Sequence, residues 1–168
     1  VLKLKNESGR ERKLSATGFL EIILGDVRSK TNMHILSEQD TETGALIFRN
    51  RYNSGFSERI SFFKVDGGYN FSYTADRSEF IGRNRHLDNP QALYRKKLSG
   101  RTGAAMDTCA ALHVKFDLLK DAEKEIIFLI GSEVNTQEAK NLLQKFADKT
   151  AVHQSLQNAK QYWKDIVE

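Results

Sequence analysis

Residues 109–118 read CAALHVKFDL, and the alternation in this stretch indicates the fold class of the whole chain. Every second position is apolar, and the polar side chains of His113, Lys115 and Asp117 occupy the positions between them. A period of two places the apolar side chains on one face of a β-strand. The segment therefore predicts a strand with one buried face. That face consists of Ala110, Leu112, Val114, Phe116 and Leu118.

The same period recurs through most of the 168-residue chain and predicts roughly eight short strands. The tetrad Asn-Glu-Ser-Gly at residues 6–9 separates strands 1–5 and 14–24, which we expect to form an antiparallel pair. The triplet Asp66-Gly67-Gly68 before Tyr69 predicts a hairpin. The remaining strands are expected at 33–39, 45–51, 59–65, 69–74 and 125–131. This regular spacing is typical of an antiparallel β-sandwich.

Near the C-terminus the apolar residues change to helical spacing and predict two helices. Asn135 followed by Glu138 resembles a capping arrangement, and Thr150 can cap the second helix. The second helix has an apolar stripe that either packs on the sheet or leads into a following helical domain. The stripe consists of Val152, Leu156, Ala159, Trp163 and Ile166. We therefore expect a β-sandwich segment over 1–133 and a helical segment over 134–168.

Residues 76–103, DRSEFIGRNRHLDNPQALYRKKLSGRTG, interrupt the strand pattern and include the only proline and a cluster of arginines. A long structured loop in a β domain is more often functional than idle. Asp76 and Glu79 fit either a general acid–base pair or salt bridges that hold the loop in shape, and we favour the salt bridges. The arginines expected as their partners are Arg77, Arg83 and Arg85.

Other side chains give weaker indications of chemistry. The four histidines lack the spacing of metal ligands, so we expect no metal site. Cys109 lies in a run of small residues and is expected to be a buried, inert thiol. The run GRTGAA at 100–105 is weak support for phosphate binding. Four aromatic residues could stack on sugar rings, but we expect at least half of them to pack in the core. They are Tyr69, Phe71, Tyr73 and Phe80.

Composition excludes several classes of protein. The net charge is +4, and the 26 basic residues are mixed with 22 acidic ones, so we expect no nucleic-acid partner. No run approaches the roughly 20 apolar residues of a membrane-spanning helix. A single cysteine rules out an internal disulfide and is compatible with a reducing compartment. The chain begins inside a strand-like run, so we expect its natural start to be missing.

Four motifs occur in an order that resembles the β-supersandwich domain of glycoside hydrolase family 94. They are DR-x-EF-IGR-x-R at 76–85, NP-x-AL at 89–93, LSGR-x-GAAMD-x-CAAL at 98–112 and IIFLIG at 126–131. That family includes cellobiose and chitobiose phosphorylases and the phosphorylase-like part of cyclic β-1,2-glucan synthases. The sequence of residues 76–85 looks closest to that of the β-1,2-glucan members. The resemblance covers essentially the whole chain.

The resemblance implies a noncatalytic sandwich domain, part of a supersandwich. In that family the sandwich precedes a helical linker and an (α/α)6 barrel, which holds the catalytic aspartate and performs inverting phosphorolysis with inorganic phosphate as co-substrate. This sequence stops where the linker would begin, so no catalytic residue or other cofactor is assigned. The implied partners are a β-glucan oligosaccharide, the barrel of the same parent protein and a second copy in a homodimer. We expect a cytoplasmic location, either free or on the cytoplasmic side of a membrane-bound parent.

By the same analogy, the residues expected to shape or contact the sugar site are all in the central loop. They are Arg77, Glu79, Phe80, Gly82, Arg83, Asn84 and Arg85. Two alternatives stay open. One is a free-standing carbohydrate-binding module of sandwich fold. The other is a small mutarotase-like enzyme, which would need His34 and His113 to meet carboxylates on one concave sheet.

Overall fold

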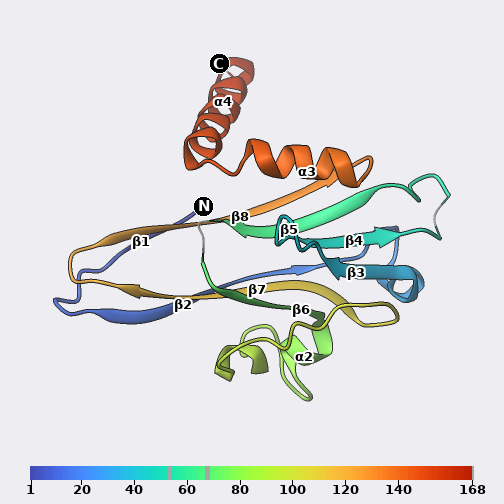
Figure 1. Ribbon diagram of the computed structural model, residues 1–168, viewed down its shortest axis with the longest axis horizontal. Helices are drawn as coiled ribbons and strands as arrows, with labels where there is room; N and C mark the ends of the chain where they lie inside the picture. The colour runs from blue at the N-terminus through green and yellow to red at the C-terminus, as the bar shows by residue number, and fades with distance from the viewer. Residues whose placement is uncertain (53, 67–68, 168) are drawn as a thin grey trace.

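Two antiparallel β-sheets lie face to face between two helical layers in the computed structural model, which describes residues 1–52, 54–66 and 69–167 (Figure 1). The larger sheet has the order β1-β8-β5-β4-β3 and the smaller one the order β2-β7-β6. The strands are β1 (Leu2–Lys5), β2 (Arg12–Glu21), β3 (Ile35–Gln39), β4 (Leu46–Asn50), β5 (Ile60–Asp66), β6 (Phe71–Asp76), β7 (Thr108–Leu118) and β8 (Glu123–Glu133). The helical elements are α1 (Arg28–Thr31), η1 (Asn32–His34), α2 (Arg77–Ile81), η2 (Gln91–Tyr94), α3 (Thr136–Lys145) and α4 (Lys149–Val167). The predicted mainly β sandwich with two C-terminal helices is confirmed.

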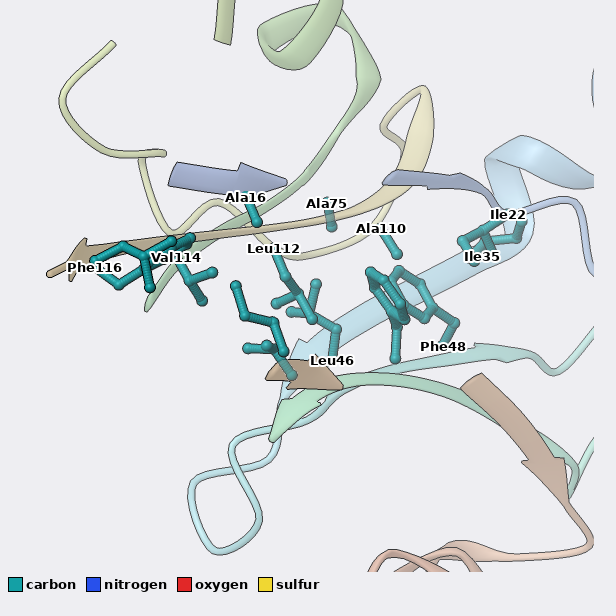
Figure 2. Close-up of a cluster of buried hydrophobic side chains, with 14 residues drawn as sticks. Ala16, Ile22, Ile35, Leu46, Phe48, Ala75, Ala110, Leu112, Val114 and Phe116 are labelled. Atoms are coloured by element: carbon teal, nitrogen blue, oxygen red, sulfur yellow. The ribbon is translucent and has the colours of Figure 1, made fainter. Parts of the chain in front are cut away.

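The main core lies between the two sheets, as the alternation in β7 predicts. Leu112 and Val114 of β7 are fully buried, and Leu46 and Phe48 of β4 lie opposite them (Figure 2). Removing these apolar faces from water is the principal force that holds the two sheets together. Three aromatic residues named above, Tyr69, Phe71 and Tyr73, also pack against this core. They are therefore packing residues.

Two predicted strand pairings are wrong, because consecutive strands change sheet. β1 pairs with β8 and β2 pairs with β7, so strands 1–5 and 14–24 do not pair with each other. Likewise β5 pairs with β4 and β8, whereas β6 pairs with β7, so the predicted hairpin does not form. Its turn residues Gly67 and Gly68 lie outside the described residues. The alternating pattern of a strand is the same whether the next strand in the chain pairs with it or lies in the facing sheet. Alternation therefore does not predict the pairing partner.

Asn6 holds one of these changes of sheet in place. Its side-chain nitrogen donates hydrogen bonds to the backbone oxygens of Arg10, Leu118 and Leu119, at 2.7, 2.9 and 2.9 Å. The turn after β1 is thereby joined to the turn after β7, where the chain also passes from one sheet to the other. Asn6 is buried, and these bonds satisfy its amide.

Helix α3 covers the outer face of the five-stranded sheet (Figure 1). Its Ala139 and Leu143 pack on Ile47 and Phe62, and the predicted cap is confirmed because Asn135 accepts a hydrogen bond from the Glu138 N–H at 2.9 Å. No described helix combines the length and apolar character that a membrane crossing would need.

Helix α4 begins at Lys149. The side chain that accepts a backbone N–H at its start is not the predicted one. The side chain of Asp148, not that of Thr150, accepts a backbone hydrogen bond, from the Thr150 N–H at 3.2 Å. Of the predicted apolar stripe, Val152 is buried, but Leu156 is 42% and Trp163 63% exposed. Most of the stripe therefore does not pack on the sheet.

Residues 76–103 form the other outer layer, against the three-stranded sheet (Figure 1). Phe80 and Leu98 pack on Cys109 and Ala111, which lie on the outer face of β7. Cys109 is fully buried, and burial raises the pKa of its thiol far above the ordinary value. The prediction of a buried thiol is confirmed, and a raised pKa disfavours the reactive thiolate.

Candidate functional site

The loop over the three-stranded sheet begins with a short helix that the sequence interpretation missed. Asp76 is the N-cap of α2: its carboxylate accepts the N–H groups of Ser78 and Glu79, at 2.8 and 3.3 Å. The same carboxylate receives a hydrogen bond from Arg101 Nη1 at 2.6 Å. Because Asp76 is 4% exposed, these donors are needed to stabilise its charge. Asp76 thus fixes both the start of the loop and a point near its end.

Glu79 is the second anchor of the loop. Its carboxylate accepts hydrogen bonds from Thr74 Oγ1 at 2.5 Å, from Ser99 Oγ at 2.5 Å and from the Ser99 N–H at 3.1 Å. Arg95 Nη1 lies 3.0 Å from Glu79 Oε1, the oxygen that also accepts the Ser99 N–H. Burial by itself would raise the pKa of Glu79, but the hydrogen bonds from Ser99 and Thr74 outweigh it and lower the pKa.

The structure thus supports the salt-bridge interpretation of these two acids over the acid–base pair. The partners differ from those expected, because Asp76 pairs with Arg101 and Glu79 with Arg95. Both arginines come from the far end of the loop, so the ion pairs close the loop on itself. Ion pairs between neighbours in the sequence could not close the loop in this way.

Replacing Glu79 by glutamine is expected to lower the free energy of unfolding at pH 7 by about 1–3 kcal/mol, because a buried charged acceptor is lost. A lowered carboxyl pKa contributes stability above the ordinary glutamate value of about 4.3, and this is lost as the pH falls through the lowered pKa. The difference between wild type and variant should therefore shrink in acid. Urea unfolding between pH 7 and pH 3 measures it.

The matched control is Glu11→Gln, which changes an exposed glutamate outside the loop. We expect it to alter the free energy of unfolding by no more than about 0.5 kcal/mol at any of these pH values. A Glu79→Gln effect that is equally small at pH 7 would show that Glu79 does not anchor the loop.

Two of the predicted sugar-site residues serve the packing of the loop. Phe80 is 3% exposed, and its ring stacks on that of Phe19 with 4.4 Å between centroids. Gly82 ends α2 with a φ of +87°, and a Cβ there would lie 2.6 Å from Cβ of Gln91. Only glycine fits this position without strain. Its role is to let the chain turn from the buried helix to the exposed part of the loop.

Arg77 is engaged in an ion-pair network at the base of the loop. Its Nε lies 2.8 Å from Glu21 Oε1 and its Nη1 lies 3.4 Å from Asp107 Oδ2. The hydrogen bond to Glu21 raises the pKa of Arg77, so its charge is fixed. Arg28 pairs with the same two carboxylates, and its Nε donates to Asp107 Oδ1 at 3.1 Å. The network joins α2 to β2, to α1 and to the start of β7.

Beyond Gly82 the loop presents polar and aromatic groups to solvent, and we call Arg83, Asn84, Arg85 and Tyr94 the arginine rim. Asn84 has a φ of +60°, which asparagine tolerates better than most residues. The Arg85 guanidinium lies 4.8 Å from the centre of the Tyr94 ring, and Tyr94 Oη donates to Asn89 Oδ1 at 2.7 Å. These contacts hold Arg85 and Tyr94 in place.

The arginine rim offers hydrogen-bond donors and an aromatic face to a ligand. Arg83 is exposed and has no hydrogen bond or ion pair within the described ranges, and Tyr94 is 67% exposed. Guanidinium and amide groups donate to sugar hydroxyls, and an aromatic face packs on a sugar ring. The structure thus leaves Arg83, Asn84 and Arg85 at the surface. Of the other predicted residues, it places Phe80 in the core and Arg77 and Glu79 in anchoring contacts.

The histidines do not converge. His34 belongs to η1 rather than to a strand, and its ring stacks on Tyr52 with 4.0 Å between centroids. His113 lies on β7 and contacts Thr17, and His153 contacts Glu125 at 2.8 Å. Among the described residues, no group of three histidine, cysteine or acidic side chains is placed to hold a metal ion. The pairing of His34 and His113 that a mutarotase-like enzyme requires has no counterpart in these contacts.

Sequence reasoning missed the residues late in the loop that contact its first residues. Arg95 and Arg101 are the ion-pair partners of the anchors, and Tyr94 completes the rim. Tyr94 could have been noticed, because an aromatic residue outside any alternating pattern has no predicted core position. Asp107 was quoted within a motif, but nothing in its neighbourhood indicates that two arginines pair with it.

Comparison with known proteins places this geometry in context. Residues 1–149 match the family model described as "Glycosyl hydrolase 94, supersandwich domain". The chain is 34% identical over 167 residues to the cyclic beta-(1,2)-glucan synthase NdvB of Rhizobium meliloti (strain 1021). This alignment covers 98% of the chain and 6% of the synthase.

Two phosphorylases are more distant relatives. The chain is 26% identical to the N,N'-diacetylchitobiose phosphorylase of Vibrio furnissii and 24% identical to that of Vibrio proteolyticus. These alignments cover 96% and 95% of the chain, and 20% of each phosphorylase. The chain therefore spans a small part of the length of each curated relative that it matches.

Proposed function

Because this chain belongs to the glycosyl hydrolase 94 supersandwich domain family, we propose that it forms one wall of a sugar site in a larger carbohydrate-active protein. The observation that supports this most directly is the arginine rim, which exposes hydrogen-bond donors and an aromatic ring on a loop anchored by two buried carboxylates. The domain supplies no catalytic group in this proposal. The catalytic residues belong to another part of the parent protein.

The names of the relatives guide the choice of parent. They are a cyclic β-1,2-glucan synthase and two chitobiose phosphorylases, so we propose that the parent is a glycoside phosphorylase or a cyclic β-1,2-glucan synthase. The proposed reaction is inverting phosphorolysis of a β-glucoside, with inorganic phosphate as co-substrate. The proposal also includes contacts between subunits in a homodimer.

In this proposal the loop works by preorganisation. Asp76 and Glu79 hold the base of the loop through hydrogen bonds and ion pairs to their buried carboxylates, so the rim does not have to be ordered when the sugar binds. Arg83 pairs with none of the described residues, so its donors can reach sugar hydroxyls, while the Tyr94 ring offers an exposed face. A sugar held between this wall and the catalytic domain would be oriented from two sides. Orientation of that kind lowers the barrier of the chemical step.

Calorimetric titration with β-1,2- and β-1,4-linked gluco-oligosaccharides tests this composite site. We expect the parent protein to bind one of these sugars and the isolated 168-residue chain to bind neither with a Kd below about 1 mM, because one wall buries too little of the sugar. Binding by the parent should be weaker after Arg83→Ala.

Saturable binding by the isolated chain that disappears on Arg83→Ala would contradict a composite site. That result would instead favour the free-standing carbohydrate-binding module, in which the rim recognises sugar unaided. Binding by the parent that is unchanged by Arg83→Ala would remove the rim from the site altogether.

A further inference from the structure

A small cavity on the outer face of the three-stranded sheet lies beside the end of the central loop. The strand register places Thr17 of β2 and Ser72 of β6 on either side of His113 in β7, so three polar side chains form one row. The cavity has a volume of about 250 Å³. Its polar lining consists of Asn70, Ser72, Lys96, Lys97, His113 and Lys115.

His113 carries a buried nitrogen that lacks a partner. Its side chain is 4% exposed, and Nδ1 lies 2.7 Å from Thr17 Oγ1. Nε2 is buried and makes no hydrogen bond with the described residues. A buried polar atom without a partner costs about 1–3 kcal/mol, so such atoms call for an explanation. When the Thr17 hydroxyl donates to Nδ1, the imidazole hydrogen is on Nε2, and this donor has no acceptor among the described residues.

Three exposed lysines line the same cavity as this imidazole. Lys96, Lys97 and Lys115 have no ion pair within the described part of the chain, and no acidic residue is among the described residues that line the cavity. Burial, followed by the charge of Lys115, lowers the pKa of His113, so its ring is neutral near pH 7. Like charges gathered at one cavity repel one another, and a bound anion would relieve this repulsion.

We propose that this cavity binds a phosphate group, either as inorganic phosphate or as the phosphate of a sugar ester. Three ammonium groups can balance a dianion, while His113 Nε2–H, the Ser72 hydroxyl and the Asn70 amide can donate to its oxygens. The Ser72 hydroxyl oxygen already accepts the Leu98 N–H at 3.0 Å, so its own hydrogen is available to a ligand. The cavity is smaller than the sites of drug-sized ligands and of a size suited to a small anion.

NMR titration of the 168-residue chain with inorganic phosphate tests the proposal. The readout is the imidazole ¹⁵N signals of His113, which a contact at Nε2 should shift in a saturable manner. The double variant Lys96→Ala/Lys97→Ala removes two exposed charges without touching the core, and should weaken binding by about tenfold or more. The control Lys13→Ala/Lys160→Ala removes two exposed lysines outside the cavity and should leave the Kd unchanged.

Parallel titrations with glucose 1-phosphate and with glucose distinguish the two sources of the phosphate group. Tighter binding of glucose 1-phosphate than of inorganic phosphate would identify a sugar ester, and equal affinities would identify free phosphate. Glucose alone should not shift the His113 signals. The proposal is overturned if neither phosphate compound shifts these signals, or if the two double variants bind phosphate equally well.

Discussion

Replacing Phe80 by alanine is expected to lower the free energy of unfolding by about 3–5 kcal/mol, the range for a buried phenylalanine. The ring is 3% exposed, stacks on Phe19 and joins Ile81 and Leu98 in the cluster that fastens the loop to β7. Alanine would leave a cavity between the loop and the sheet. Urea unfolding of wild type and variant at pH 7 measures the difference.

Leu93→Ala is the matched control, because it shortens an apolar side chain of the same loop that is 53% exposed. We expect it to change the free energy of unfolding by less than about 0.5 kcal/mol. A Phe80→Ala variant as stable as this control would show that the Phe80 ring is not in the core. The predicted role of Phe80 in contacting sugar would then be open again.

Much of the sandwich could be predicted from the sequence, because burial imposes a period of two on each strand. The segment 109–118 shows this most clearly, since its five predicted inward side chains are all in the core. Strand partners could not be predicted in the same way. Alternation shows that a face is buried but does not say whether the next strand lies beside it or across the core. The strands before and after residues 6–9 lie in different sheets for this reason.

Helix α2 was missed because it is too short to show a period. Residues 77–81 make little more than one turn, so only the cap could have revealed them. Asp76 followed by Glu79 does match a helix start, but the same two acids also suggested an acid–base pair or salt bridges. In the structure Asp76 is both the cap and an ion-pair partner.

The sequence analysis placed the candidate site residues in the central loop, but it did not predict which of them are buried and which are exposed. Residues 77–85 were grouped because they are neighbours in sequence, yet a turn of helix points Phe80 into the core while the loop leaves Arg83 exposed. Tyr94 joins Arg85 only because the loop folds back on itself. Such contacts depend on Asp76 and Glu79 finding partners 25 and 16 residues away, which no local pattern indicates.

Arg83→Ala is expected to lower kcat/KM of the parent protein by about 10- to 100-fold, the effect of losing one or two hydrogen bonds from a charged donor. Arg83 is exposed and has no partner within residues 1–52, 54–66 and 69–167. Its removal should therefore leave the free energy of unfolding of the domain within about 0.5 kcal/mol of wild type. Separation of a large kinetic effect from a small stability effect is the signature of a residue that contacts substrate.

The most direct test of a sugar-site role for this domain is therefore the rate of sugar 1-phosphate formation by the parent protein. The substrates are inorganic phosphate and a β-1,2-linked gluco-oligosaccharide, and the variants are Arg83→Ala and the control Arg10→Ala, an exposed arginine outside the loop. We predict that kcat/KM falls by at least about tenfold with Arg83→Ala and stays at the wild-type value with Arg10→Ala. A folded Arg83→Ala protein with the kcat/KM of wild type would contradict this role.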